Sequence, residues 1–241
     1  PVLYREIFPY EDVPRIVFNH RIVPMNPPEK MRISDTTFRD GQQARPPFTP
    51  KQILHIYDLL HRLGGPQGII SQCEFFVYSE RDRTALRLCQ ERGYEYPEVT
   101  AWIRASRKDF QLVRQLGVKE TGILTSASDY HIFLKLKKTR RQAMEDYLTV
   151  VKMALEEGIV PRCHLEDITR ADFYGFVVPF VHELMELGRE AGVPIKIRAC
   201  DTLGFGVTYP GVALPRSVKG IVHGLRSFAG VPAEQLEWHG H

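Results

Sequence analysis

The sequence lacks any long hydrophobic stretch and any visible signal peptide. No apolar run in its 241 residues approaches the roughly 18 to 20 residues of a membrane-spanning helix. Charge of one sign is also scarce, since 32 Lys and Arg against 29 Asp and Glu leave a formal net charge of +3. These absences argue against a membrane protein and against a nucleic-acid-binding surface, so we expect neither kind of partner.

Cysteine is sparse and follows no paired pattern. The four thiols, at Cys73, Cys89, Cys163 and Cys200, form no CxxC motif, so the usual signatures of a zinc finger or a disulfide framework are absent. Three of them fall in apolar, strand-like segments. We therefore expect buried free thiols in a protein of the reducing cytoplasm.

The composition that remains is that of an ordinary globular domain. Hydrophobic residues make up 43% and charged residues 25% of a chain long enough to bury a substantial core as a single domain. The densest basic cluster, within residues 135–141, falls where a strand end meets a helix start. It indicates a solvated face or a local phosphate contact.

Residues 1–30 are rich in proline and are predicted to form an irregular N-terminal arm. Residues 31–241 then repeat one unit, which is a strand rich in β-branched residues, a polar cap, an amphipathic helix and a glycine. Helices are predicted after the caps at Thr49, Ser79 and Thr139, over residues 108–116, and from Thr169 to Gly192. Strands are predicted at 32–38, 68–77, 98–104, 120–126, 160–166, 194–202 and 235–241.

Seven strands that alternate with helices predict an α/β fold with a parallel sheet. This number of units without a break in composition favours a (β/α)8 TIM barrel over an open sheet. Such a barrel has eight strands, so we expect this chain to hold seven of the eight and to lack the C-terminal part of the barrel. We therefore interpret residues 31–241 as an incomplete catalytic barrel domain.

Polar residues gather at the predicted C-terminal strand ends, where barrels of this type carry their active sites. Asp40 follows the first strand, and the last strand ends in His239-Gly240-His241. Alternate residues of a strand point to the same side, so both imidazoles are aimed at one place. One carboxylate and two imidazoles with open positions would bind a divalent cation such as Mg, Mn, Co or Zn as a Lewis acid.

Four motifs in this order resemble the metal-dependent Claisen-condensing and aldol-cleaving barrels. Members of that family include isopropylmalate synthase, homocitrate synthase, Re-type citrate synthase and 3-hydroxy-3-methylglutaryl-CoA (HMG-CoA) lyase. The segment DTTFRDGQQ at 35–43 resembles the strand-one signature, with Phe38 in place of Leu. The segments EDITR at 166–170, DTLG at 201–204 and HGH at 239–241 are similar to the motifs of strands five, six and seven.

The resemblance implies an acyltransferase that condenses acetyl-CoA with a 2-oxo acid. Asp40, His239 and His241 would be the metal ligands, and Arg39 would polarise the ketone and stabilise the developing alkoxide. Glu74 and Glu166 would position Arg39 or a water, with a pure ion-pair role left open for each. A further Asn ligand and the catalytic base of many family members would lie beyond residue 241. A homodimer is expected.

The strand-five segment bears on which oxo acid is used. Arg162 stands where homocitrate synthases hold the distal carboxylate of 2-oxoglutarate, so the resemblance favours a dicarboxylic oxo acid. His164 replaces a Ser of that family, and its larger side chain would shorten the pocket and favour oxaloacetate. Residues 102–105 and 128–131 resemble the Re-type citrate synthases most. The expected substrate contacts are Gln43, Arg104, His131, Arg162, His164 and Thr202.

Plainer interpretations stay open for several of these residues. Arg39 and Asp40 could be an ion pair at a helix cap, and His131 could be a packed histidine. Glu166 and Asp167 could be acids favoured at a helix N-terminus. Three functions remain possible for this site. The first is a synthase, with 2-isopropylmalate synthase as an alternative to the citrate or homocitrate reaction. The second is a lyase of the HMG-CoA lyase type on the same metal site, and the third is a substrate-sensing relative without turnover.

Overall fold

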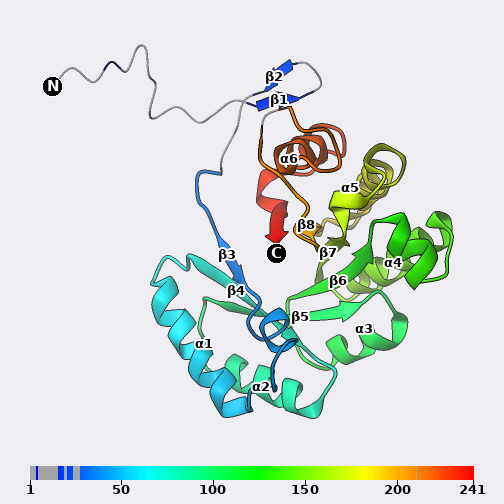
Figure 1. The fold of residues 1–241 in the computed structure, drawn as a ribbon. Coiled ribbons are helices and arrows are strands. Elements are labelled where there is room, and N and C mark those ends of the chain that lie inside the picture. The colour runs from blue at the N-terminus through cyan, green and yellow to red at the C-terminus, as the bar shows by residue number, and fades with distance from the viewer. Residues whose placement is uncertain (1–3, 5–15, 19–20, 24–27, 210) are drawn as a thin grey trace.

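A computed structural model describes residue 4 and residues 16–18, 21–23, 28–209 and 211–241. Seven strands form one parallel sheet in the order in which they occur along the chain (Figure 1). They are β3 (Ile33–Asp35), β4 (Ile70–Phe76), β5 (Glu98–Arg104), β6 (Glu120–Ser126), β7 (Val160–Glu166), β8 (Lys196–Asp201) and β9 (Leu236–Gly240). The sequential order confirms the α/β barrel-type fold, with seven strands that make up a curved half-barrel.

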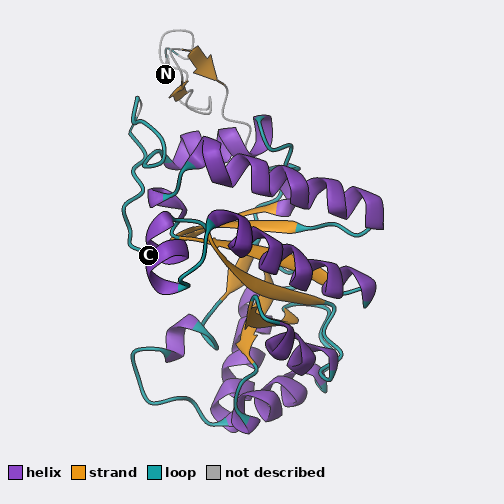
Figure 2. Cartoon of the chain, turned by 90° about the vertical axis from the view of Figure 1, so that its right-hand side faces the viewer, coloured by secondary structure: helices purple, strands orange, loops and turns teal. Residues whose placement is uncertain are grey.

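In the described part of the chain, six α-helices cover the outer side of this sheet (Figures 1 and 2). They are α1 (Pro50–Gly64), α2 (Glu80–Gln90), α3 (Arg107–Arg114), α4 (Arg140–Glu156), α5 (Val178–Ala191) and α6 (Val218–Ser227). The caps expected at Thr49, Ser79 and Thr139 are confirmed, because each side chain accepts a hydrogen bond in a reciprocal capping box. Among the described residues, no helix is both long and apolar enough to cross a membrane.

The predicted strand at 32–38 is too long. Strand β3 ends at Asp35, whose carboxylate accepts hydrogen bonds from the Thr37 backbone N–H at 3.0 Å and the Thr37 hydroxyl at 2.9 Å. These local bonds offer the backbone an alternative to the sheet ladder, so the chain turns immediately after the strand. The turn leads directly to Arg39 and Asp40.

The continuous helix predicted from Thr169 is also wrong. A 3-10 turn, Ile168–Arg170, and a π-helical turn, Phe173–Val177, precede α5, which begins only at Val178. Asp167 adopts a left-handed backbone with φ of 63°, and the Asp172 side chain caps the π-helical turn by accepting from the Gly175 N–H at 2.9 Å. Side-chain caps of this kind compete with regular helix and divide the segment.

The two faces of the sheet carry different side chains because successive strand residues point to opposite sides. Apolar residues pack against the helices and form the core; examples are Phe75, Ile103, Ile123, Leu165 and Ile197. Alternate residues from neighbouring strands contact one another on the concave side, and they include the charged side chains of Glu74, Glu120, Arg162 and Arg198. The four cysteines are free and buried, as expected.

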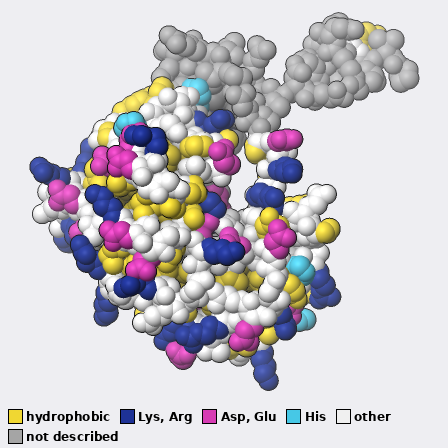
Figure 3. Space-filling view, turned by 180° about the vertical axis from the view of Figure 1, so that it is seen from behind, with side chains coloured by type: hydrophobic (Ala, Val, Ile, Leu, Met, Phe, Trp, Pro, Cys, Tyr) yellow, Lys and Arg dark blue, Asp and Glu magenta, His cyan; other side chains and the backbone are white. Residues whose placement is uncertain are grey.

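A separate antiparallel hairpin of β1 (Ile16–Phe18) and β2 (Arg21–Val23) falls within the expected arm. Most of the remainder of residues 1–27 lies outside the described residues, so the domain division at residue 30 stays a prediction. On the face drawn in Figure 3, acidic and basic side chains are interspersed, with apolar side chains between them.

Candidate metal and substrate site

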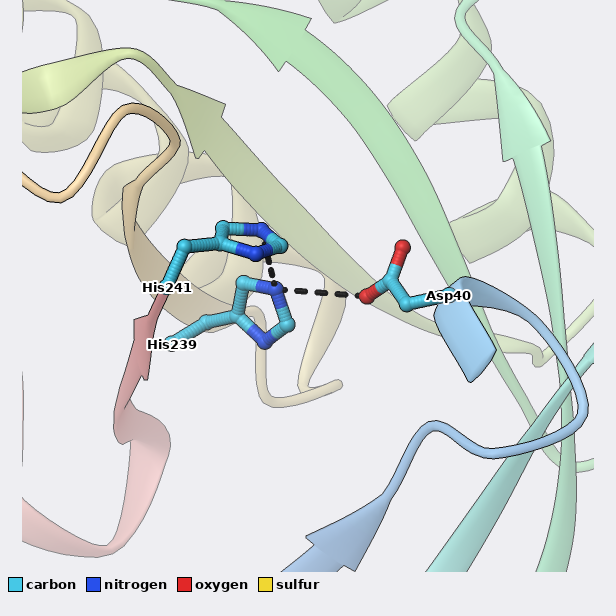
Figure 4. Close-up of side chains that lie close together, drawn as sticks. All are labelled: Asp40, His239 and His241. Atoms are coloured by element: carbon cyan, nitrogen blue, oxygen red, sulfur yellow. Dashed lines mark hydrogen bonds and ion pairs between the residues drawn. The ribbon is translucent and has the colours of Figure 1, made fainter. Parts of the chain in front are cut away.

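Asp40, His239 and His241 lie at the ends of the two outermost strands of the sheet. Asp40 opens the 3-10 turn that follows β3, His239 lies near the end of β9, and His241 directly follows that strand (Figure 4). The Asp40 Oδ2 atom lies 3.2 Å from His239 Nε2, which lies 3.2 Å from His241 Nε2. One ligand atom from each of the three residues falls within 4.8 Å of the others, as a shared cation requires.

The donor set fits a divalent metal. Asp40 Oδ2 is a buried oxygen that makes no hydrogen bond of regular geometry to any described residue, so it is available as a ligand. Burial alone would raise the pKa of Asp40, but the contact with His239 and the charge of Arg39 outweigh it and lower the pKa. The carboxylate is therefore ionised, as coordination requires. Three protein ligands leave positions for substrate, as in catalytic sites.

Arg39 is held beside this carboxylate by a second one. Its Nη1 atom donates to Asp40 Oδ1 at 2.5 Å, and its Nε atom donates to Glu74 Oε2. Burial would raise the pKa of Glu74, but Arg198, His164 and Arg39 outweigh it and hold the pKa well below its usual range. An ionised Glu74 thus fixes the orientation of the Arg39 guanidinium, and a catalytic role for Glu74 stays a prediction.

Glu166 forms another cluster at the ends of β6 and β7. It accepts hydrogen bonds from the Ser126 hydroxyl and from Lys135 Nζ at 2.9 Å, and it lies 2.8 Å from His131 Nδ1. Burial would raise the pKa of Glu166, but these three partners lower it. Nearby, the Thr202 hydroxyl accepts from the Asp167 backbone N–H at 2.8 Å. The structure therefore brings Glu166, His131 and Thr202 to one rim.

Arg162 lies lower on the concave side than the sequence interpretation assumed. Arg162 pairs with Gly122, whereas His164 pairs with Leu124. The first pair lies two residues earlier in both strands, which places it about 7 Å below the second pair along the strands. The Arg162 guanidinium contacts Glu120 and Gln72, and its Nε lies 3.3 Å from Glu237. A substrate carboxylate would have to replace these partners, so the role of Arg162 stays a prediction.

Three other predicted substrate contacts are placed apart from the metal triad or are already engaged. His164 is buried, with Trp102 and Glu74 as neighbours. Arg104 donates to Asp109 of α3 at 2.8 Å and covers the Tyr78 ring. Gln43 is exposed at the end of the 3-10 turn. Contact of these side chains with substrate also stays a prediction.

Sequence reasoning missed three residues that support the site from the concave side of the sheet, namely Arg198, Glu237 and Trp102. Arg198 of β8 donates to Glu74 at 2.9 Å and to both carboxylate oxygens of Glu237, and Trp102 of β5 donates to His164. The sequence did offer a signal for Arg198. Lys196, Arg198 and Cys200 alternate along a predicted strand, so their side chains share one face of the sheet and place the Arg198 guanidinium on it. Trp102 belongs to the segment 102–105 that resembles the Re-type citrate synthases, but its side chain was assigned no role.

Comparison with known proteins gives close relatives over the whole chain. The chain is 61% identical over 241 residues to a Citrate (Re)-synthase of Clostridium kluyveri and to another of Syntrophus aciditrophicus. It is 40% identical to the 2-phosphinomethylmalate synthase of Streptomyces hygroscopicus. The chain spans 53%, 38% and 56% of these proteins respectively, so it corresponds to about half of their length or less.

Solved structures share the fold at lower identity. The HMG-CoA lyase of Pseudomonas aeruginosa aligns with a TM-score of 0.66 and 20% identity, covering 90% of this chain and 70% of that one. The lyase of Brucella melitensis aligns with a TM-score of 0.63 and 19% identity, covering 89% and 73%. The family model described as HMGL-like matches residues 30–241, which confirms the resemblance drawn from the motifs, and the chain belongs to the HMGL-like family.

Proposed function

We propose that the protein containing this chain condenses acetyl-CoA with a dicarboxylic 2-oxo acid, with oxaloacetate as the first candidate and citrate as the product. The observation that carries the proposal is the convergence of Asp40, His239 and His241 with Arg39 directly beside them. The 61% identity to two proteins named Citrate (Re)-synthase supports this choice of reaction. The enzyme would be an acyl-CoA:2-oxo acid C-acyltransferase.

Asp40, His239 and His241 would hold a divalent ion, which we propose to be Mg, Mn, Co or Zn. When bound, such an ion supplies a Lewis acid that withdraws charge from the carbonyl of a chelating 2-oxo acid. Arg39 then donates a charge-assisted hydrogen bond to the ketone oxygen, which becomes negative as the acetyl carbon bonds to C2. Glu74 keeps the guanidinium oriented for that task.

We assign Glu166 to the handling of water in the hydrolysis that releases CoA from the thioester. Its carboxylate lies within hydrogen-bonding distance of Ser126, Lys135 and His131 and is partly accessible at the rim. His131 and Thr202, at the same rim, are the proposed contacts for the far end of the oxo acid. The base that removes the methyl proton of acetyl-CoA is not assigned to any residue described here.

The length of the oxo acid follows from the concave interior below the site. His164 occupies the layer between the strand ends and Arg162, and it is buried. A short four-carbon acid requires less depth than 2-oxoglutarate, so the position of His164 favours oxaloacetate. The second candidate substrate is 2-oxoglutarate, favoured by Arg162 if its carboxylate partners give way. We further propose a cytoplasmic homodimer.

The test is calorimetric binding of oxaloacetate, 2-oxoglutarate and 2-oxoisovalerate to the full-length protein with Mn²⁺, followed by thiol release from acetyl-CoA. Preference for oxaloacetate together with CoA release is the expected result. Preference for 2-oxoisovalerate would replace the proposal with 2-isopropylmalate synthesis. Binding of none of the three would favour a lyase or a sensor, and cleavage of HMG-CoA would then separate these two.

A further inference from the structure

Trp102 makes a hydrogen bond that identifies the proton position on a buried histidine. Its indole Nε1 lies 3.2 Å from His164 Nδ1, across the concave side of the sheet. An indole N–H can only donate, so Nδ1 of His164 must accept. In a neutral imidazole the proton is then on Nε2, and the histidine is a donor on its other side.

The environment keeps His164 neutral. Burial, with a further contribution from the charge of Arg198, lowers the pKa of His164 to about 3. Its Nε2 atom makes no hydrogen bond of regular geometry to any described residue, and Glu74 Oε1 lies 3.2 Å from it. In the Nε2–H tautomer the proton is therefore on the nitrogen that is close to this carboxylate oxygen.

Glu74 connects His164 to the metal site through Arg39. Its other oxygen, Oε2, accepts from Arg39 Nε, and Arg39 Nη1 donates to Asp40 at 2.5 Å. The Arg39 guanidinium also lies 5.3 Å from the centre of the Trp102 ring, within reach of a cation–π contact. Trp102 thus contacts His164 and Arg39, the first and the last of the three residues that connect it to Asp40.

The backbone leaves space for this arrangement at a single glycine. A Cβ atom on Gly122 of β6 would lie 2.7 Å from His164 Nε2, 2.8 Å from Trp102 Cδ1 and 3.0 Å from Glu74 Oε1. Three side chains from three strands therefore converge over one residue that has none. Any larger residue would displace at least one of them.

We propose that Trp102 is a positioning residue for Arg39, because its indole N–H fixes the Nε2–H tautomer of His164 and the contacts through Glu74 then hold the guanidinium beside Asp40. The catalytic consequence rests on the proposed function, whereas the tautomer does not. Along this route Trp102 is separated from Asp40 by four contacts, so the orientation of Arg39 depends on a side chain remote from the metal ligand.

The first test needs no turnover. Long-range 1H–15N NMR spectra of the full-length protein, labelled with 15N-histidine, report the tautomer of His164, with His164→Gln used to assign its signals. We expect the Nε2–H form at neutral pH and a mixture of tautomers in Trp102→Phe, which keeps a ring but removes the donor. An Nδ1–H form in the parent protein, or an unchanged Nε2–H form in Trp102→Phe, would overturn the proposal.

The second test separates positioning from general loss of structure. We expect Trp102→Phe to lower kcat about tenfold while the KM of the oxo acid and the calorimetric affinity for Mn²⁺ change less than about twofold, since Arg39 acts mainly on the transition state. Trp238 lies on β9 and packs against the core, so Trp238→Phe is the matched control and should change kcat less than about twofold. Equal effects of the two substitutions, or parallel losses of metal affinity and kcat, would refute the positioning role.

Discussion

Arg39 combines two contacts that only a guanidinium can make together. One nitrogen donates to Glu74 and another to Asp40, so the planar fork is fixed from both sides. Lysine carries the same charge on a flexible stem and lacks this fork. Arg39, the residue that we propose to polarise the ketone, is thus distinguished by geometry more than by charge.

We predict that Arg39→Lys lowers kcat by about 100- to 1000-fold, the range seen when one oriented donor to a developing oxyanion is lost. Because the charge is retained, affinity for the oxo acid should change much less than kcat. Steady-state kinetics with saturating Mn²⁺ would measure both. A kcat within a factor of three of the parent value would show that Arg39 has no such role.

His164 predicts a pH dependence of stability. Its folded pKa, about 3, is lower than the ordinary value of 6.5, so between these values the unfolded chain binds more protons than the folded one. The free energy of unfolding therefore falls as the pH decreases from about 6.5, by up to about 1.4 kcal/mol per pH unit for this one group. Stability contributed in this way is fully present above pH 6.5.

Urea unfolding of the parent protein and His164→Gln between pH 7 and pH 5 would measure this contribution. Glutamine does not titrate, so the difference in stability between the two proteins should shrink as the pH falls. Glu74, whose folded pKa is lowered well below 4.5, adds its own loss only at more acidic pH. A difference that is independent of pH would contradict the buried, neutral state of His164.

At the scale of the element, strand pairing determines which side chains meet on the concave side. The register joins Leu124 to His164 and Gly122 to Arg162, so successive layers are separated by one alternation of the strands. Trp102 pairs with Gly122 in the neighbouring pair of strands and lies over it. A substitution in one strand therefore affects side chains that belong to three strands.

We predict that Gly122→Ala lowers the free energy of unfolding by about 1 to 3 kcal/mol, as overpacking does, and also disturbs the contact of Trp102 with His164. Gly93→Ala is the contrast, because its Cβ would meet nothing within 4 Å although φ is 64°. It should cost about 1 to 2 kcal/mol from backbone strain alone and leave the His164 tautomer unchanged. Thermal unfolding and the NMR spectra described above would distinguish the two.

At the scale of the whole molecule, curvature of the sheet brings its first and last strands to one place. Asp40 follows β3 and His239 lies on β9, the two edges of the sheet, yet their side chains are 3.2 Å apart. An ion bound there would link segments separated by about 200 residues of sequence. Metal binding should therefore stabilise the whole fold.

We predict that Mn²⁺ at 100 times its dissociation constant raises the free energy of unfolding by about 2.7 kcal/mol, and that a chelator reverses this gain. For a domain of this size the midpoint should rise by roughly 5 to 10 °C. Calorimetry of His239→Ala should show no shift, whereas His55→Ala, on the exposed side of α1, should retain it. A shift that survives in His239→Ala would place the ion elsewhere.

The sequence alone predicted the alternating strands, the capped helices and the metal triad. These follow from local information, since side-chain periodicity and cap residues act within a few positions, and the family motifs are contiguous. The helix from Thr169 failed because Asp167 adopts a left-handed backbone and the Asp172 side chain caps a separate π-helical turn, and periodicity registers neither feature.

Only the tertiary structure determined the depth of each charged residue and the identity of its partner. Arg162 looked like a free cation in sequence, but strand register places it among Glu120, Gln72 and Glu237, one layer below His164. The link from Trp102 through His164 to Glu74 joins residues of three strands. Such contacts depend on register and sheet curvature, which arise from pairing between segments distant in sequence, and no single segment encodes them.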